Sequence, residues 1–459
     1  MVRIFKHYIP FRLVLVSILE AATFFSSIPI ARFLNQSDST PVDYIFYIAF
    51  AYTLVTIFSM AAVGLYSRSL HEDFKRLVFR LLLLMVVVVI LMSFLFYLLP
   101  ILFMTRTTFI YALMLSGSAL VVVRTLLFIS IDREYFKQNI IVFGAGKKAK
   151  QLNEMHRKLD TKTIKIVGFL PIETEEVLIE QSQLISLPNT LLEYVIANDI
   201  DEIIVAIDDR RKRFPVDDVL ECKVNGTQVL DVSTFFERQT GRITLNALHP
   251  SNLIFSDGFI QNNFYQLLKR LFDIMASLIL LMVTWPVMII TALAIMIESG
   301  FKGTILYKQV RVGLYNENFE VFKFRSMGMD AEKNGAQWAQ KVDARVTKVG
   351  EIIRKYRIDE LPQLFNVIKG EMSFVGPRPE RPEFVKELSE KIKFYEIRHY
   401  IKPGITGWAQ ICYPYGANEE DSRNKLEYDL YYMKNFSIFL DVMILLQTIQ
   451  VVVWRQGSR

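Results

Sequence analysis

Long apolar segments alternate with short polar ones over the first 130 or so residues. Each apolar segment is close to the ~20 residues that a helix needs to cross ~30 Å of hydrocarbon. The pattern predicts four membrane-spanning helices, near Phe11–Leu34, Tyr44–Tyr66, Leu81–Phe103 and Phe109–Ile131. Together they form the first predicted domain, residues 1–135.

The polar segments between these helices differ in charge. Lys and Arg occur in the N-terminal tail and in the second loop, whereas the first loop, residues 35–43, has neither. Basic loops remain in the cytoplasm, so four crossings return the chain to the cytoplasm near Asp132. We expect this module to be an anchor without chemistry, because Glu20 and Arg124 are too few charges for a transport pathway.

Short apolar runs separated by helical patterns mark a second predicted domain, residues 136–262. Strands are expected at Asn139–Phe143, Ile164–Leu170 and Ile203–Ile207, which together favour a parallel α/β sheet. The first strand leads into the glycine-rich turn of Gly144–Ala149, and the segment resembles half of a dinucleotide-binding, Rossmann-like fold. Leu170-Pro171 stands where an acidic residue should hold a ribose. A structural or regulatory domain is therefore favoured over one that binds a cofactor for catalysis.

The third predicted domain, residues 263–459, opens with another long apolar run, Leu271–Ile297. Basic residues lie on both sides of this run, so both of its ends belong in the cytoplasm. Pro286 lies near its middle and removes a backbone hydrogen bond. We predict a re-entrant membrane helix, residues 267–299, with a break at Pro286. A single fifth crossing is the alternative.

Composition agrees with a membrane protein. Hydrophobic residues make up 52% of the chain and mean hydropathy is +0.28, an apolar content that a soluble protein does not easily keep off its surface. Cys222 and Cys412 are too few for a disulfide framework or a metal site, which fits a reducing compartment. The net charge of +6 is explained by anionic headgroups and phosphates, and no nucleic acid is expected as a partner.

Two strands rich in cations follow the apolar run, at Tyr307–Gly313 and Phe322–Met327. In the second, alternation places Phe322 and Phe324 on one face and Lys323 and Arg325 on the other. A face with paired cations suits a diphosphate. A solvated edge strand is the alternative.

Two adjacent carboxylates, Asp359 and Glu360, precede Pro362 and an apolar stretch that Gly370 would end. This pattern predicts a short helix that starts at or near Asp359. The positive end of that helix would favour ionised Asp359 and attract a phosphate. An ordinary helix cap is the alternative reading of the pair.

Proline and glycine turns come next, at Gly376–Arg381 and Lys402–Gln410. The prolines around Arg378 hold its guanidinium in place, so that it can bind two phosphate oxygens. In the second turn we expect the glycines to let backbone approach a ligand closely.

The order and spacing of these motifs resemble the bacterial sugar transferase family, the monotopic polyprenyl-phosphate sugar-1-phosphate transferases. The large members that initiate exopolysaccharide or O-antigen synthesis also have four spans and a Rossmann-like domain. One departure is Trp285 before Pro286, where some relatives carry Ser or Asp. The motifs that carry the resemblance are the hairpin with Pro286, Lys323–Met327, Asp359–Gln363, Gly376–Glu380 and Pro403–Gln410.

The resemblance implies a two-step reaction. Asp359 attacks the sugar-bearing phosphorus of a UDP-sugar and expels UMP, and polyprenyl phosphate then attacks the resulting acyl phosphate. Mg²⁺ is implied as cofactor, with Glu360 as its protein ligand and as the second catalytic carboxylate. The residues expected to bind substrate are Lys308, Arg311, Lys323, Arg325, Arg357, Arg378 and Arg381.

The resemblance also implies a multi-pass protein of the bacterial cytoplasmic (inner) membrane, with its catalytic domain on the cytoplasmic face. Expected partners are the bilayer, the UDP-sugar, polyprenyl phosphate and downstream glycosyltransferases, and a homodimer is left open. Two helical stretches near the C-terminus, Phe384–Tyr400 and Phe439–Trp454, are expected at the membrane interface.

Two other functions compete with this one. A membrane-anchored NAD-dependent nucleotide-sugar dehydratase or epimerase would need a Tyr-x-x-x-Lys pair, and Tyr265 and Lys269 form one just before the apolar run. A scaffold or regulator of polysaccharide assembly is the other alternative, but it would give Asp359, Glu360 and Arg378 no reason to cluster. The sequence does not identify the sugar.

Overall fold

In the computed structural model the chain forms two compact units, Ser118–Leu248 and the combination of Met1–Gly117 with His249–Arg459. The predicted boundary 135/136 and residue 262 fall outside the described residues. Of the second loop used to predict orientation, Arg68 also falls outside them, whereas Lys75, Arg76 and Arg80 lie in a helix that begins at Phe74. The structure describes all residues except 1, 5–6, 10, 37, 39–40, 67–73, 132–136, 160–163, 173–174, 188–189, 209–214, 246–257, 260–262, 330–344, 414–415, 417 and 455–459.

Helices lie at the four predicted membrane segments. They pack through apolar side chains and a few buried hydrogen bonds: the hydroxyl groups of Tyr52 and Ser116 lie 2.7 Å apart, and the Tyr66 hydroxyl donates to Glu20 at 2.7 Å. Among the described residues, five helices are long and apolar enough to cross a membrane. These are α1 (Phe11–Leu34), α2 (Val42–Val63), α3 (Phe74–Leu98), α4 (Arg106–Ile131) and α10 (Asn263–Glu298).

A four-stranded parallel sheet forms the core of the second unit, as predicted, with the strand order β4-β3-β5-β6. The third predicted strand ends at Val205, two residues early, and the fourth strand was not predicted. The strands are β3 (Gln138–Phe143), β4 (Ile164–Leu170), β5 (Glu202–Val205) and β6 (Gln228–Asp231).

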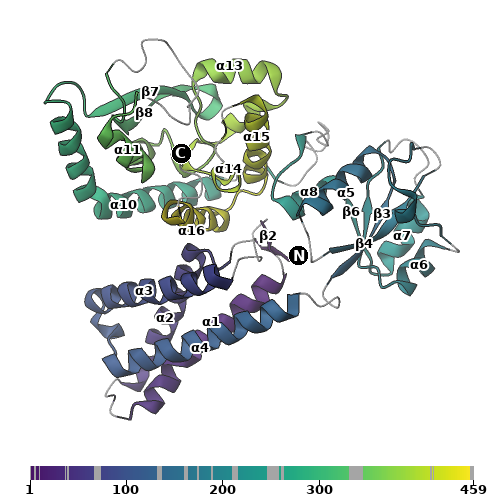
Figure 1. Cartoon of the computed structure of the whole chain (residues 1–459), viewed down its shortest axis with the longest axis horizontal. Coiled ribbons are helices and arrows are strands. Elements are labelled where there is room, and N and C mark those ends of the chain that lie inside the picture. The colour runs from purple at the N-terminus through teal and green to yellow at the C-terminus, as the bar shows by residue number, and fades with distance from the viewer. Residues whose placement is uncertain are drawn as a thin grey trace. The chain divides into compact units, whose positions relative to one another are not determined.

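Helices cover both faces of this sheet because its strands are apolar on both sides. Ile140 and Val142 of β3 pack with Phe235 on one face, and Ile141 packs with Val195 on the other. Figure 1 shows this three-layer arrangement. On one side lie α5 (Lys147–Leu159) and α8 (Val232–Thr240), and on the other α6 (Leu191–Ala197) and α7 (Val216–Val224).

The region after α10 contains two small sheets surrounded by helices. An antiparallel ribbon is formed by β7 (Leu306–Val312) and β8 (Asn318–Phe324), and a parallel pair by β9 (Ser373–Val375) and β10 (Gly404–Thr406). The helical elements are α11 (Lys348–Lys355), the 3-10 turn η6 (Ile358–Glu360), α12 (Gln363–Lys369), α13 (Pro382–Lys391), η7 (Tyr395–Tyr400), α14 (Trp408–Cys412), α15 (Glu419–Lys434) and α16 (Ile438–Trp454).

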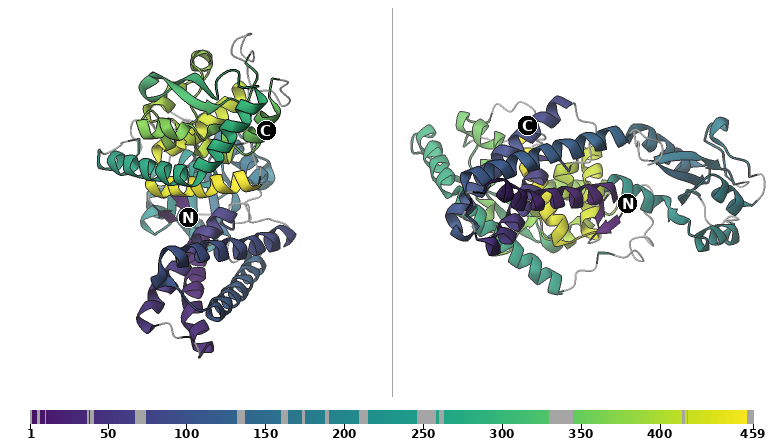
Figure 2. Two further views of the ribbon diagram at one scale, coloured as in Figure 1. Left: turned by 90° about the vertical axis from the view of Figure 1, so that its left-hand side faces the viewer. Right: turned by 90° about the horizontal axis from the view of Figure 1, so that it is seen from below.

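The apolar run that was predicted to contain a break forms one continuous helix, α10, with Pro286 inside it. Figures 1 and 2 show that α10 bends instead of breaking. Near its start, Arg270 donates to the carbonyl oxygens of Val367 and Ile368 at 2.5 Å each. At its end, the Glu298 carboxylate accepts the N–H of Val349 at 3.0 Å. Both ends of α10 therefore contact the domain that follows it.

A buried group of charges joins α10 to α16. Lys269 lies 2.8 Å from a carboxylate oxygen of Asp441 and 3.1 Å from one of Asp273. Asp273 also accepts the backbone N–H of Phe374 at 3.0 Å, and the Tyr432 hydroxyl donates to Asp441 at 2.6 Å. Lys269 is thus fixed in ion pairs, whereas Tyr265, its partner in the dehydratase alternative, is 54% exposed.

Candidate active site

The two adjacent carboxylates lie in a 3-10 turn that precedes α12. Arg357 has a left-handed backbone (φ 55°), which costs on the order of 1–3 kcal/mol for a residue other than glycine. Arg357 lies between the end of α11 at Lys355 and the turn Ile358–Glu360. The next α-helix, α12, begins at Gln363. The helix predicted to start at or near Asp359 starts as this 3-10 turn, and the α-helix itself begins four residues after Asp359, whereas Gly370 ends α12 in the left-handed conformation as predicted.

Three cations surround the buried carboxylate of Glu360. Arg378 donates from Nη2 to Oε1 at 2.9 Å, and Lys323 Nζ lies 3.6 Å from the same oxygen. Arg357 donates to Oε2 through Nε at 3.2 Å and Nη2 at 3.0 Å. Three of the residues predicted to bind substrate, Lys323, Arg357 and Arg378, thus meet at Glu360.

Asp359 is partly exposed and differs from its neighbour in its electrostatics. Burial and the adjacent Glu360 charge raise the pKa of Asp359 to about 6, against the opposing effects of Lys323, Arg357 and Arg354. Burial would also raise the pKa of Glu360, but Arg378, Arg357 and Lys323 hold it well below the ordinary value. The site therefore has one carboxylate whose pKa is held well below its ordinary value and one whose pKa is raised to about 6.

Arg378 stands in a turn that β10 holds in place. Gly376 donates its N–H to the Thr406 carbonyl at 2.9 Å, and Gly404 donates to the Pro377 carbonyl at 2.9 Å. A Cβ at Gly376 would collide with the carbonyl oxygen of Lys402. The glycines in these two turns are therefore needed because one backbone segment packs directly on another. The sequence analysis had instead expected glycines in the second turn to let backbone approach a ligand.

A second support for Arg378 was missed by the sequence analysis. Arg398 donates to the carbonyl oxygen of Arg378 at 3.1 Å and to Asp429 at 2.8 Å from the same nitrogen, and its other terminal nitrogen donates to the Tyr395 hydroxyl at 2.7 Å. Arg398 and Asp429 are both buried. No local pattern reveals this contact, because Arg398 and Asp429 lie far from Arg378 in sequence.

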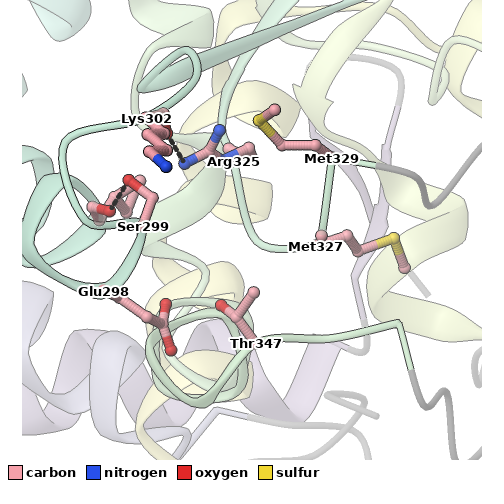
Figure 3. A pocket seen from close by; sticks show the side chains of 9 residues that line it. Glu298, Ser299, Lys302, Arg325, Met327, Met329 and Thr347 are labelled. Atoms are coloured by element: carbon pink, nitrogen blue, oxygen red, sulfur yellow. Dashed lines mark hydrogen bonds between the residues drawn. The ribbon is translucent and has the colours of Figure 1, made fainter.

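Two predicted phosphate ligands lie away from Glu360. In the β7–β8 ribbon, Lys308 pairs in register with Phe322, which places it on the face opposite Lys323, where it forms an exposed ion pair with Glu320 at 2.9 Å. Arg325 follows the last residue of β8 and points into a cavity at the end of α10 (Figure 3). The strict alternation used for prediction does not extend beyond the strand.

The remaining predicted cations lie beside the Arg378 turn. Arg311 donates to the Pro379 carbonyl at 3.1 Å and lies 3.5 Å from Glu380, and its charge contributes to lowering the pKa of Lys323. The pKa of Lys323 falls to about 8, mainly because the amine is buried. Arg381 occupies the position just before α13.

Glu360 does not fit the predicted role of Mg²⁺ ligand. Both of its oxygens already face cations, and a bound Mg²⁺ would have to displace them. Among the described residues, no group of three or more His, Cys, Asp or Glu side chains could hold a metal ion. Asp359 is the more exposed of the two carboxylates and the better candidate to share a cation with substrate phosphates.

In the second unit, the glycine-rich turn is occupied by a side chain of the chain itself. The Asp208 carboxylate accepts the backbone N–H groups of Lys147 and Lys148 at 2.8 and 3.0 Å, at the start of α5. This is the place where a dinucleotide-binding fold receives a pyrophosphate.

Comparison with protein-family models matches residues 264–455 to a model described as "Bacterial sugar transferase" and residues 61–217 to one described as a "CoA-binding domain". A relative from Aeromonas hydrophila, named UDP-N-acetylgalactosamine-undecaprenyl-phosphate N-acetylgalactosaminephosphotransferase, is 44% identical over 238 residues, 52% of this chain and 55% of that protein. A Xanthomonas campestris pv. campestris relative, named UDP-glucose:undecaprenyl-phosphate glucose-1-phosphate transferase, is 30% identical over 328 residues, 68% of this chain and 66% of that protein.

A shorter relative matches the catalytic region alone. The "Uncharacterized sugar transferase EpsL" of Bacillus subtilis (strain 168) is 41% identical over 191 residues, which are 42% of this chain and 90% of that protein. By contrast, the chain spans only about half of the Aeromonas relative and just under two thirds of the Xanthomonas one.

Proposed function

The chain belongs to the bacterial sugar transferase family, and we propose that it transfers a sugar-1-phosphate from a UDP-sugar to undecaprenyl phosphate, or a similar polyprenyl phosphate, and releases UMP. The product, a polyprenyl diphosphate sugar, would initiate an exopolysaccharide or another surface glycan and pass to downstream glycosyltransferases. The observation that carries the proposal is the pairing of a partly exposed Asp359 with a Glu360 that holds three cations.

In the first half-reaction, the Asp359 carboxylate oxygen forms a bond to the sugar-bearing phosphorus. The bond from that phosphorus to the bridging oxygen breaks, and UMP leaves with the electron pair. Arg378, Lys323 and Arg357 lie where they can bind the negative charge that develops on the diphosphate. Glu360 keeps these three cations together in the absence of substrate.

In the second half-reaction, an oxygen of the polyprenyl phosphate attacks the same phosphorus and the bond to Asp359 breaks, which restores the carboxylate. Two successive displacements at one carboxylate allow the donor product to leave before the acceptor binds. Mg²⁺, when bound, would neutralise charge on the diphosphate, held by Asp359 and phosphate oxygens.

The covalent intermediate gives a direct test. Purified protein is incubated with a panel of UDP-sugars carrying label in the sugar and in its phosphate, without acceptor, then denatured and digested. We expect labelled phospho-sugar on the peptide that contains Asp359, stoichiometric UMP release, and neither with Asp359→Asn. Label on another residue, or a strictly sequential rate law, would show that the carboxylates act in acid-base or metal chemistry.

We further propose that α1–α4 form a four-span module and that α10 enters the bilayer and returns on the cytoplasmic side. The support is that both ends of α10 contact the same folded domain, through Arg270 and Glu298, which a helix crossing the membrane once does not allow. Cysteines introduced at 262 and 305 should both be labelled from the cytoplasmic side only. External labelling of 305 would exclude a re-entrant α10.

A further inference from the structure

A cavity of about 300 Å³ lies at the C-terminal end of α10, away from the Glu360 cluster. Its walls come from the end of α10, from the chain just after β8 and from the residue before α11 (Figure 3). It is lined by Ile295, Glu298, Ser299, Lys302, Arg325, Met327, Gly328, Met329 and Thr347.

Two cations lie together on one wall of this cavity. Figure 3 shows Lys302 beside Arg325, and Arg325 Nη2 makes a long contact of 3.5 Å to the Lys302 carbonyl oxygen. Within the part of the chain that the structure describes, neither side chain forms an ion pair. The Glu298 carboxylate on another wall accepts the N–H of Val349 in the first turn of α11, which offsets its charge. The cavity therefore offers two cationic donors to an anion.

An exposed apolar surface leads to the cavity. On α10, Leu293 and Ile297 are 52% and 69% exposed, and Phe301, just after the helix, is 74% exposed. Since α10 is a candidate membrane helix, hydrocarbon would cover this surface and a lipid headgroup would lie level with the end of the helix. Cations at the end of a lipid-exposed helix match a molecule with a phosphate head and a hydrocarbon tail.

The cavity also lies close to the catalytic turn along the chain. Arg325 follows Lys323, which contacts Glu360, by two residues, a separation of roughly 7 Å in extended chain. On the other side, Thr347 begins the segment that leads through α11 to Arg357 and Asp359. A phosphate held by Arg325 would thus be bound by segments that lead directly into the catalytic turn, and it would not occupy Arg378, which contacts Glu360.

We propose that this cavity binds the phosphate group of the polyprenyl phosphate acceptor, with the first isoprene units along the exposed face of α10. The inference rests on the proposed function and adds the acceptor site to it. An ordinary anionic phospholipid offers the same chemistry, a phosphate on a hydrocarbon chain, and the experiment below separates the two sources.

The test compares Arg325→Ala and Lys302→Ala with Arg325→Lys, in nanodiscs of phosphatidylcholine with and without phosphatidylglycerol. We expect the alanine variants to raise KM for polyprenyl phosphate about 10- to 100-fold, the loss expected for one charge-assisted hydrogen bond. UMP release in single turnover without acceptor should stay within about twofold, because the donor binds elsewhere. Arg325→Lys should recover part of the affinity. Lys386→Ala, an exposed cation on α13, serves as the control.

Binding is also measured without catalysis, with a short-chain polyprenyl phosphate and the Asp359→Asn protein. If adding Arg325→Ala to the Asp359→Asn protein weakens binding of the polyprenyl phosphate, the acceptor site is supported even when no UDP-sugar reacts. Failure of the proposed function can therefore be told apart from failure of the proposed site. A parallel fall in UMP release would place Arg325 in the donor site and overturn the proposal. So would an unchanged acceptor KM, or an effect that follows phosphatidylglycerol instead of polyprenyl phosphate.

Discussion

Asp359 and Glu360 are neighbours in one turn, yet their surroundings shift the pKa values of their carboxyl groups in opposite directions. Glu360 faces Arg378, Arg357 and Lys323 directly and stays ionised, and its charge in turn makes ionisation of Asp359 less favourable. A carboxylate whose pKa lies near 6 is more basic, and hence more nucleophilic, than an ordinary aspartate while still ionised at neutral pH. The adjacent pair thus tunes one member for reaction.

These shifts predict the pH dependence of the first half-reaction. Below about pH 6 Asp359 becomes protonated, and the rate of UMP release should fall by about tenfold per pH unit. Above about pH 8 Lys323 loses its charge and the rate should fall again. Glu360→Gln removes the neighbouring negative charge, so the acid limb should move to lower pH. Single-turnover UMP release measured across pH checks both statements, and an acid limb that ignores Glu360→Gln would contradict the assignment.

Arg378 is predicted to act together with Glu360. Arg378→Ala should lower the rate on the order of 10²-fold, as expected for loss of a fixed donor to developing charge. Because the two side chains are hydrogen-bonded, the double variant with Glu360→Gln should lose less than the product of the two single losses. Single-turnover rates of the four proteins give the coupling, with Lys386→Ala as the control. Strictly additive losses would mean that Arg378 and Glu360 work independently.

Residues of this site could be predicted from sequence where chemistry and spacing coincide in one short segment. Asp359, Glu360 and Arg378 were proposed in this way, and the structure brings Arg378 to Glu360. Arg325 was given the wrong place because it lies one residue beyond its strand. Arg398 could not be found, because its contact with Arg378 depends on how η7 and α15 fold back over the turn. Contacts between distant segments of this kind leave no periodic pattern in the sequence.

At the scale of elements, the pairing of α10 with α16 depends on one cation between two carboxylates. Lys269→Met would leave Asp273 and Asp441 buried without it, and we expect a loss of roughly 3–5 kcal/mol of stability. Asp441→Asn should cost less, because the Lys269–Asp273 pair keeps its charge balance. Thermal or denaturant unfolding of both variants in the same detergent shows which variant loses more stability. Equal losses, or a larger loss for Asp441→Asn, would contradict the dependence on Lys269.

The sequence predicted most elements but not how the catalytic turn is built. Apolar periodicity located α1–α4, α10 and three of the four strands of the β4-β3-β5-β6 sheet because burial sets their patterns. The start of α12 was misplaced because Pro362 suits a first turn equally well whether the helix begins before or after it. The left-handed Arg357 moved that start, and an arginine carries no local signal for such a conformation. Arg357 is held in this conformation by its local ion pair with Glu360, which Arg378 and Lys323 hold in turn from distant parts of the chain.

At the scale of the whole molecule, the second unit retains a dinucleotide-binding sheet whose anion site is already filled. Because Asp208 accepts the N–H groups that would hold a pyrophosphate, the domain has no need of a cofactor to satisfy the start of α5. This favours a structural or regulatory role, and the full chain should show no oxidoreductase turnover with NAD or NADP. Its match to a CoA-binding model covers residues 61–217, which include α3 and α4 as well as three of the strands, and the match assigns no ligand.

The catalytic region should therefore work without the two preceding domains. The segment that matches the present chain makes up 90% of the length of the Bacillus subtilis relative EpsL. We expect a protein that begins near Asn262 to fold and to retain transferase activity within about tenfold of the full chain, because α10 is long and apolar enough to attach it to a membrane. Transfer of labelled sugar phosphate to extracted lipid measures this, and the same truncation with Asp359→Asn is the control.

A truncated protein that unfolds cooperatively but transfers nothing would show that the earlier domains take part in the reaction. Loss of membrane attachment by the truncation would instead assign the anchoring to α1–α4 and remove the re-entrant role of α10.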